Sequence, residues 1–184
     1  MTFNIEGFYR NSFYLSQILS TSTPPGLIFL QEIWVPYSQE SAIDKIYPDY
    51  SIQISTPDMF VPPEDKLGSS DHVWHGAAIM WHVSLNPSIS SLSTTNARFT
   101  GVKLKTQNQR FLLISVYFPT SGKDDEYLEC ITDLVNFAVE NKEEHETLLI
   151  GTDSNCSASS SLRRRLAFIN LCQQLSLIKV SCSH

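Results

Sequence analysis

The sequence lacks the features that would place it in several specialised classes of protein. No apolar run approaches the roughly 20 residues of a transmembrane helix, so no membrane span is expected. The four cysteines form no C-x-x-C pair, and their spacing fits no zinc site. The first residues, MTFNIEGFYRN, lack a basic flank and a long apolar stretch, so no secretory signal is expected. Reduced, structural thiols suit an intracellular compartment.

An excess of basic residues is also missing. The formal net charge is −6, whereas proteins that hold nucleic acid by bulk electrostatics are usually basic. Any action on nucleic acid would therefore depend on a local groove. The 42% hydrophobic and 17% charged composition is typical of a globular chain rather than a disordered one. Because no internal repeat or linker interrupts the 184 residues, a single domain over residues 1–184 is expected.

Short apolar runs alternate with longer amphipathic segments along the chain. Strands are expected at residues 3–7, 26–32, 50–55, 76–85, 99–106, 110–119, 146–151 and 178–184. Helices are expected at 11–20, 38–48, 124–142 and 157–177, with a loop at 57–73. The runs 99–106 and 110–119 should pair as an antiparallel hairpin. This alternation favours a layered α/β or α+β domain.

The helical segments carry more detailed predictions. Asn11 or Ser12 is the candidate N-cap of the first helix. The apolar positions of helix 124–142 are Leu128, Ile131, Leu134, Val135 and Ala138. Those of the Ser-capped helix 157–177 are Leu162, Leu166, Ile169, Leu171 and Leu175. The basic run LRRR at 162–165 is interpreted either as a solvated helix surface or as a phosphate contact.

Polar side chains stand where several of the expected strands end. They are Asn4, Glu32, Tyr117, Asp153 and Asn155. Strand ends combine a rigid backbone with access to solvent, so sites gather there. Glu32 suits a hard cation such as Mg²⁺, and Asp153 could orient or deprotonate a water. Asn155 and Tyr117 could donate to a phosphate, and together these groups suit metal-assisted phosphodiester hydrolysis.

Each of these residues has an ordinary structural alternative. A glutamate at a strand end is often only a solvated charge, and Asp-x-Asn after a glycine commonly caps a turn. A tyrosine before Phe-Pro is often a half-buried aromatic residue. The order and context of the motifs decide between the two interpretations.

Five segments, FNIEG, LIFLQE, HGAAIMW, LLISVYFP and LLIGTDSN, follow the order and approximate spacing of motifs in the endonuclease/exonuclease/phosphatase superfamily. The sequence most resembles the endonuclease domain of non-LTR retrotransposons, which precedes a reverse transcriptase domain. The resemblance implies a four-layer α/β sandwich, with two mixed β-sheets packed face to face and flanking helices. It also implies a Mg²⁺- or Mn²⁺-dependent hydrolase, with DNA as partner and an intracellular, nuclear location.

The resemblance also implies a role for each strand-end residue. Asn4 matches an asparagine that hydrogen-bonds around the metal and the phosphate, and Glu32 matches the metal-binding glutamate. Tyr117 matches a tyrosine that contacts the phosphate. Asp153 matches the aspartate that positions the attacking water, and Asn155 the asparagine beside it.

The superfamily pattern continues beyond what this sequence supplies. It would add a further metal-site aspartate and a terminal Ser-Asp-His, so the resemblance implies a sandwich that is incomplete at the C-terminus. Ser70, Asp71 and His72 spell this motif, but they lie far too early and are expected to form a solvated loop. His72 and His75 are weak evidence for a metal site, and His184 has no preceding aspartate.

Alternative functions stay open at this stage. The same fold could serve an RNA deadenylase or a phosphatase acting on lipid headgroups, since a fold alone does not separate these substrates. A third alternative is a catalytically inactive remnant of such a domain.

Overall fold

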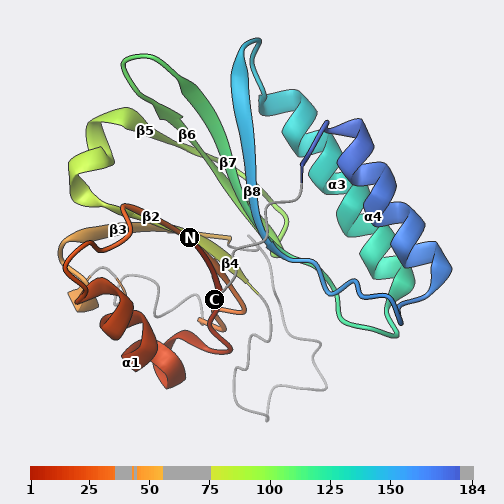
Figure 1. The fold of residues 1–184 in the computed structure, drawn as a ribbon, viewed down its shortest axis with the longest axis horizontal. Coiled ribbons are helices and arrows are strands. Elements are labelled where there is room, and N and C mark those ends of the chain that lie inside the picture. Colours follow the sequence, from red (N-terminus) through yellow and green to blue (C-terminus); the bar gives the residue numbers. More distant parts are fainter. Residues whose placement is uncertain (36–42, 44, 56–75, 179–184) are drawn as a thin grey trace.

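The computed structural model of the chain describes residues 1–35, 43, 45–55 and 76–178. Two four-stranded sheets face one another, and helices lie on their outer sides (Figure 1). The first sheet, in the order β1-β2-β4-β3, contains β1 (Thr2–Asn4), β2 (Leu27–Gln31), β3 (Tyr50–Ile54) and β4 (Ala77–His82). The second, in the order β5-β6-β7-β8, contains β5 (Ile89–Leu92), β6 (Phe99–Lys105), β7 (Arg110–Tyr117) and β8 (Glu146–Asp153).

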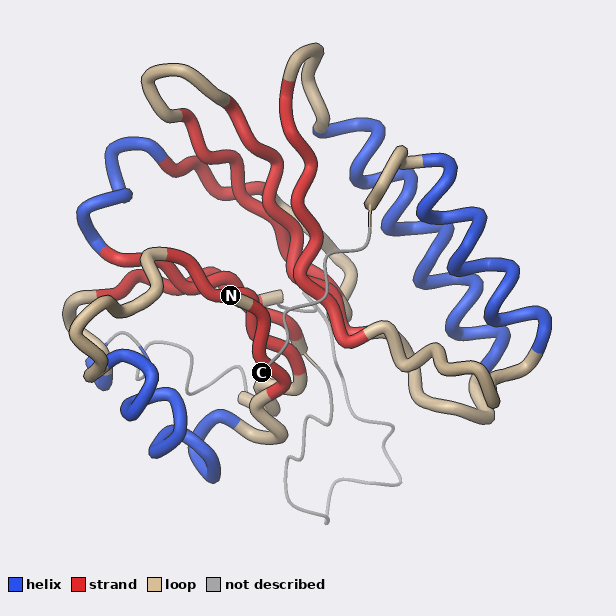
Figure 2. Tube along the Cα trace, in the orientation of Figure 1, coloured by secondary structure: helices blue, strands red, loops and turns tan. Residues whose placement is uncertain are grey.

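Helices cover the outer face of each sheet, so the expected four-layer sandwich is confirmed (Figure 2). Helix α1 (Phe8–Leu19) lies against the first sheet, and α3 (Asp124–Asn141) and α4 (Leu162–Gln174) lie against the second. A 3₁₀ helix, η3 (Val83–Ser88), connects β4 to β5. Within the described ranges, no helix is long and apolar enough to cross a bilayer. The described cysteines, Cys130, Cys156 and Cys172, are free thiols.

Each sheet is mixed, and its parallel pair determines where side chains meet. Strands β1 and β2 are parallel and place Asn4 opposite Gln31. Strands β7 and β8 are parallel and place Tyr117 opposite Asp153. The other pairs are antiparallel, including the predicted β6–β7 hairpin. Because parallel strands end at the same edge of a sheet, each pair delivers two polar strand ends together.

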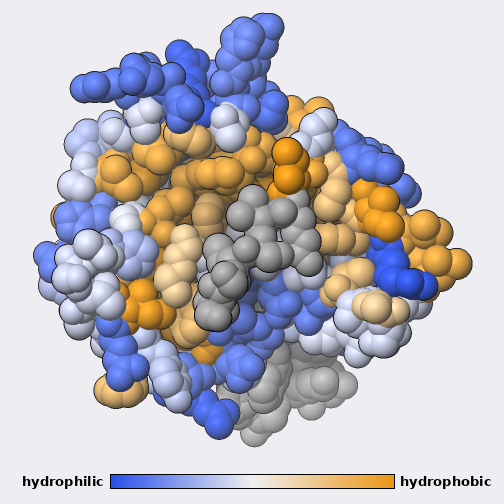
Figure 3. Space-filling model, in the orientation of Figure 1, coloured by the Kyte–Doolittle hydropathy of each residue, from blue (hydrophilic) through white to orange (hydrophobic). Residues whose placement is uncertain are grey.

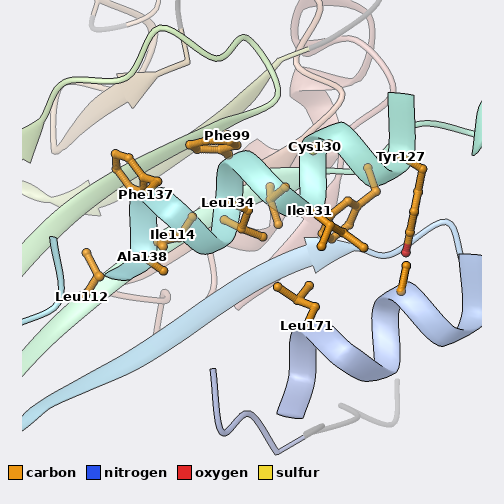
Figure 4. Close-up of a cluster of buried hydrophobic side chains, with 13 residues drawn as sticks. Phe99, Leu112, Ile114, Tyr127, Cys130, Ile131, Leu134, Phe137, Ala138 and Leu171 are labelled. Carbon is orange, nitrogen blue, oxygen red and sulfur yellow. The ribbon is translucent and has the colours of Figure 1, made fainter. Parts of the chain in front are cut away.

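Three apolar clusters hold the layers together. The cluster between the sheets contains Phe29, Ile79, Trp81, Val102 and Leu113. A second lies between α1 and the first sheet, and the largest lies between the second sheet and helices α3 and α4 (Figure 4). A buried polar link also joins the sheets, because Gln31 Nε2 donates to Ser115 Oγ at 3.1 Å. Ser115 Oγ in turn donates to the Leu30 carbonyl at 2.9 Å, so this inter-sheet link is hydrogen-bonded on both sides.

Several predicted boundaries differ in the structure. Helix α1 begins at Phe8 after Gly7, whose φ of 97° turns the chain directly out of β1, so the predicted caps Asn11 and Ser12 are wrong. The Asn11 amide instead donates to the carbonyls of Ile5 and Glu6. The expected strand 76–85 stops at His82, and β5 was not predicted. The predicted elements 38–48, 57–73 and 178–184 lie mostly or wholly outside the described residues.

The buried face of α4 also differs from its predicted apolar positions. Leu171 is buried, but Leu162, Leu166 and Ile169 are 63%, 50% and 50% exposed. Hydrophobic side chains are visible on the surface over α4 (Figure 3). The buried residues are Arg164, Ala167 and Leu171. Compared with the predicted orientation, α4 turns a different face to the core, because the paired guanidinium of Arg164 occupies a buried position. The interpretation of LRRR as a solvated helix surface is therefore wrong for Arg164.

Candidate active site

Two carboxylates from different sheets share one amide group. Asn4, at the end of β1, donates through Nδ2 to Glu32 Oε1 and to Asp153 Oδ2, each at 2.9 Å. The two acceptor oxygens are therefore separated by no more than twice that distance. Glu32 directly follows β2, and Asp153 ends β8. These two hydrogen bonds thus join three of the five predicted site residues across the interface between the sheets.

The backbone determines which way the Asn4 amide points. Glu6 N donates to Asn4 Oδ1 at 3.1 Å, which leaves the Nδ2 group to face the carboxylates. Glu6 and Glu32 both have positive φ values, 46° and 54°. Non-glycine residues in this region cost about 1–3 kcal/mol each and tend to cluster at functional sites. The backbone is therefore strained at Glu6 and Glu32, the residues that orient the Asn4 amide and present a carboxylate.

Tyr117 lies at the same site. The side chain is 5% exposed. Burial, followed by the negative charge of Glu32, raises its pKa to about 12, while Arg98 acts in the opposite direction. The charge of Asp153 and a hydrogen bond with Glu32 raise the pKa further. Tyr117 is therefore a neutral hydroxyl donor at physiological pH, next to two carboxylates.

Asn155 lies beside the site, but its amide is already engaged. Its Nδ2 donates to the Phe118 carbonyl at 2.7 Å, and its backbone N donates to Asp153 Oδ1 at 3.2 Å. Its φ is 44°. Asn155 thus ties the end of β8 to the end of β7 and holds the second oxygen of Asp153. Its predicted contact with a phosphate stays a prediction.

The donor set fits a hard divalent cation. Mg²⁺ prefers oxygen ligands, and it is usually held by one or two carboxylates while it keeps several waters. Glu32 and Asp153 supply two such carboxylates, and neither forms an ion pair with another described residue. Among the described residues, no group of three or more His, Cys, Asp or Glu side chains is arranged to bind a metal. Glu32 would be the main protein ligand, with Asp153 across the site.

The other residues considered from the sequence lie outside the described residues; they are Ser70, Asp71, His72, His75 and His184. Sequence reasoning missed the inter-sheet role of Gln31, although its position beside Glu32 was a signal. It also missed Arg164, for which a basic run on a helix gave no sign of burial.

Comparison with solved structures finds this fold at low sequence identity. The endonuclease domain of TRAS1, a telomere-specific non-LTR retrotransposon, is 14% identical over 95% of this chain and 68% of its own, with a TM-score of 0.58. A 3'-5' exonuclease from Neisseria meningitidis is 16% identical over 94% of this chain and 70% of its own, with a TM-score of 0.61. An AP endonuclease from Archaeoglobus fulgidus is 15% identical, with coverages of 94% and 68% and a TM-score of 0.62.

The chain is shorter than these structures. It spans 66% of the length of a humanized D. rerio TDP2 structure and 62% of D. rerio TDP2 complexed with single-strand DNA product. No protein-family model and no curated protein matches it. The structural matches combine with the observed two-sheet sandwich, so the chain has the fold of the endonuclease/exonuclease/phosphatase superfamily.

Proposed function

We propose that this chain is a metal-dependent phosphodiester hydrolase that acts on DNA. The observation that carries the proposal is the Asn4 amide, which holds Glu32 and Asp153 together beside a neutral Tyr117 hydroxyl. The DNA assignment is supported by the similar structures, which include an exonuclease, an AP endonuclease and a complex with a DNA product.

The side chains divide the work of an in-line displacement. Asp153 would accept a proton from the attacking water and orient it toward phosphorus. The Tyr117 hydroxyl would donate a hydrogen bond to a non-bridging phosphate oxygen, and Asn4 would keep the two carboxylates in register. Mg²⁺ or Mn²⁺, held chiefly by Glu32, would supply a Lewis acid that offsets charge on the phosphoryl and leaving oxygens.

The finer proposal is a retrotransposon-type endonuclease that nicks target DNA. The order of the sequence motifs supports it, as does the similarity to the TRAS1 endonuclease domain over 95% of this chain. In such an element a reverse transcriptase domain would follow as a partner, and the nick would be made in nuclear DNA. RNA and lipid-headgroup substrates are tested as alternatives, because the fold alone does not select among them.

Nicking of supercoiled plasmid in the presence of Mg²⁺ tests the proposal. Asp153→Asn should lower the rate by about 10²- to 10⁴-fold, since it removes the group that takes a proton. Asp49→Asn is the matched control because Asp49 is exposed and lies in the turn before β3. EDTA should stop the wild-type reaction.

Three results would contradict this assignment. Equal nicking by wild type and Asp153→Asn would refute the role of Asp153. Faster cleavage of poly(A) RNA or of a phosphoinositide than of plasmid would favour a different substrate. Absence of hydrolysis on all three substrates would favour an inactive remnant.

A further inference from the structure

Arg164 is a buried arginine on the inner face of α4. It is 1% exposed and is the largest fully buried side chain among the described residues. An arginine in such a position is strongly unfavourable unless its charge and its donors are all engaged. A leucine or methionine would fill a helix interface at lower cost. The partners of this guanidinium therefore indicate what the residue does.

The guanidinium binds two loops that come from two neighbouring strands. Its Nη1 donates to the carbonyls of Pro119 and Asn155 at 2.7 and 3.0 Å, and its Nη2 donates to the Thr120 carbonyl at 2.7 Å. Its Nε donates to Asp124 Oδ1 at 3.1 Å. Pro119 and Thr120 follow β7, and Asn155 follows β8, so Arg164 links the two strand ends that present Tyr117 and Asp153.

Helix α3 holds the guanidinium from the other side. The Tyr127 ring lies under it, with the central carbon 4.2 Å from the ring centroid, a favourable cation–π arrangement. The Tyr127 hydroxyl donates to the Ser154 carbonyl at 3.2 Å. The carbonyls of Ser154 and Asn155 are thus both fixed from outside the loop.

This fixed loop is directly connected to the site. Asn155 N donates to Asp153 Oδ1, while Asp153 Oδ2 accepts from Asn4. Asn155 also has a φ of 44°, a conformation that non-glycine residues seldom adopt unaided. A change at the Asn155 carbonyl would therefore move the backbone N–H that orients the Asp153 carboxylate.

We propose that Arg164 is a positioning residue for the active site. It holds the loop after β8 against the loop after β7, and this keeps the Asp153 carboxylate directed at Asn4 and Glu32. The inference rests on the proposed hydrolase function. Lysine cannot replace it, because a single ammonium lacks the planar fork that reaches acceptors in three directions.

Kinetics of plasmid nicking separate positioning from simple support of the fold. Arg164→Lys and Arg164→Met should lower kcat by about 10²-fold, the loss expected from a misplacement near 1 Å, and change KM little. Leu171→Ala is the control, because Leu171 is buried on the same helix and its aliphatic side chain forms no hydrogen bond to either loop. At temperatures where all variants are folded, Leu171→Ala should keep the wild-type kcat.

Hydrogen exchange of the Asn155 backbone amide gives a readout that does not depend on activity. This N–H donates to Asp153 Oδ1, so its exchange should accelerate in both Arg164 variants and not in Leu171→Ala. If exchange is unchanged in the Arg164 variants, Arg164 does not hold the loop after β8 in place, whether or not the wild type is active. A kcat loss that only follows the loss of stability, equal in Leu171→Ala, would overturn the positioning role. An inactive wild type whose Arg164 variants show faster exchange would refute the hydrolase proposal and leave Arg164 as an anchor of the loop alone.

Discussion

At the scale of single residues, the geometry of the site depends on the Asn4 amide. Glu32 and Asp153 come from different sheets, and one amide group contacts both. The amide can do this only because Glu6 N occupies its oxygen and turns Nδ2 toward the acids. Asn4 therefore connects the two carboxylates, and its replacement should change the positions of both.

Asn4→Asp tests this role directly. The variant would replace the shared donor with a third negative charge, so the two acids would lose their common partner and repel the new group. We expect the nicking rate to fall about 10²-fold, the scale seen when one well-placed donor is lost from an active site. Asn108→Asp is the control, because Asn108 lies in the exposed turn between β6 and β7. Equal activity of both variants would show that the shared amide is dispensable.

The environment of the Tyr117 hydroxyl predicts how its protonation depends on pH. Its pKa is raised to about 12 by burial and by the charge of Glu32, so it keeps its proton well above the ordinary value for tyrosine. In the metal-free protein, the Tyr117 phenol should therefore stay protonated between pH 9 and about 11, as measured by the difference in ultraviolet absorbance between wild type and Tyr117→Phe at each pH. Tyr117→Phe should also nick plasmid more slowly than wild type at neutral pH. A difference spectrum that shows the phenolate forming with a midpoint near 10 would contradict the raised pKa.

At the scale of elements, pattern predicted the strands and helices better than it predicted which way they face. The helix 124–142 is predictable because its apolar residues follow one period, and the strand at 146–151 because its apolar residues form a short contiguous run. The predicted apolar positions of helix α4 are confirmed at Leu171 and wrong at Leu162, Leu166 and Ile169. The pattern treats every arginine as exposed, whereas Arg164 is buried by partners far away in sequence. The site residues were found from strand ends and the superfamily resemblance, but their shared amide depends on sheet packing that no local pattern contains.

Gly151 shows how closely the two sheets approach. A Cβ at this position would lie 2.2 Å from Cγ of Phe29 across the interface. Gly151→Ala should therefore lower the free energy of unfolding by about 1–3 kcal/mol, the usual range for overpacking, as measured by denaturant titration. Gly26→Ala is the control, since a Cβ there would meet nothing within 4 Å. Phe29→Ala removes the Cγ and ring atoms that the new Cβ would meet, so the double variant should lose less stability than the sum of the two single variants. A lack of any coupling would contradict the steric explanation.

The contact between α3 and α4 predicts a response to acid. Hydrogen bonds from Ser161 and Arg164 lower the pKa of Asp124 below its ordinary value of 3.8. The stability that this carboxylate contributes is therefore complete above about pH 4 and is lost as pH falls through the lowered pKa. Asp124→Asn should be less stable than wild type at pH 6, and the difference should shrink toward pH 3 in thermal unfolding. Glu129→Gln is the control on the same helix, because Glu129 is exposed and forms no ion pair with another described residue. A constant difference between Asp124→Asn and wild type across this range would exclude the linkage.

At the scale of the whole molecule, the candidate site belongs to neither sheet alone. Glu32 follows β2 in the first sheet, and Asp153 ends β8 in the second. Their approach depends on the apolar cluster between the sheets and on the buried link from Gln31 to Ser115. A cation held between the two acids would bind the packed sandwich and not the unfolded chain.

Binding of the cation to the folded state alone must raise the free energy of unfolding, by an amount that increases with the cation concentration. A cation at about 100 times its dissociation constant adds about 2.7 kcal/mol when only the folded state binds it. Thermal unfolding of the wild type should therefore shift upward with Mg²⁺, and Glu32→Gln should abolish the shift. Glu140→Gln, an exposed change of the same kind on α3, should keep it. This measurement needs no substrate, so it is independent of activity on DNA. If the unfolding temperature of the wild type does not change with Mg²⁺, Glu32 and Asp153 do not hold the cation.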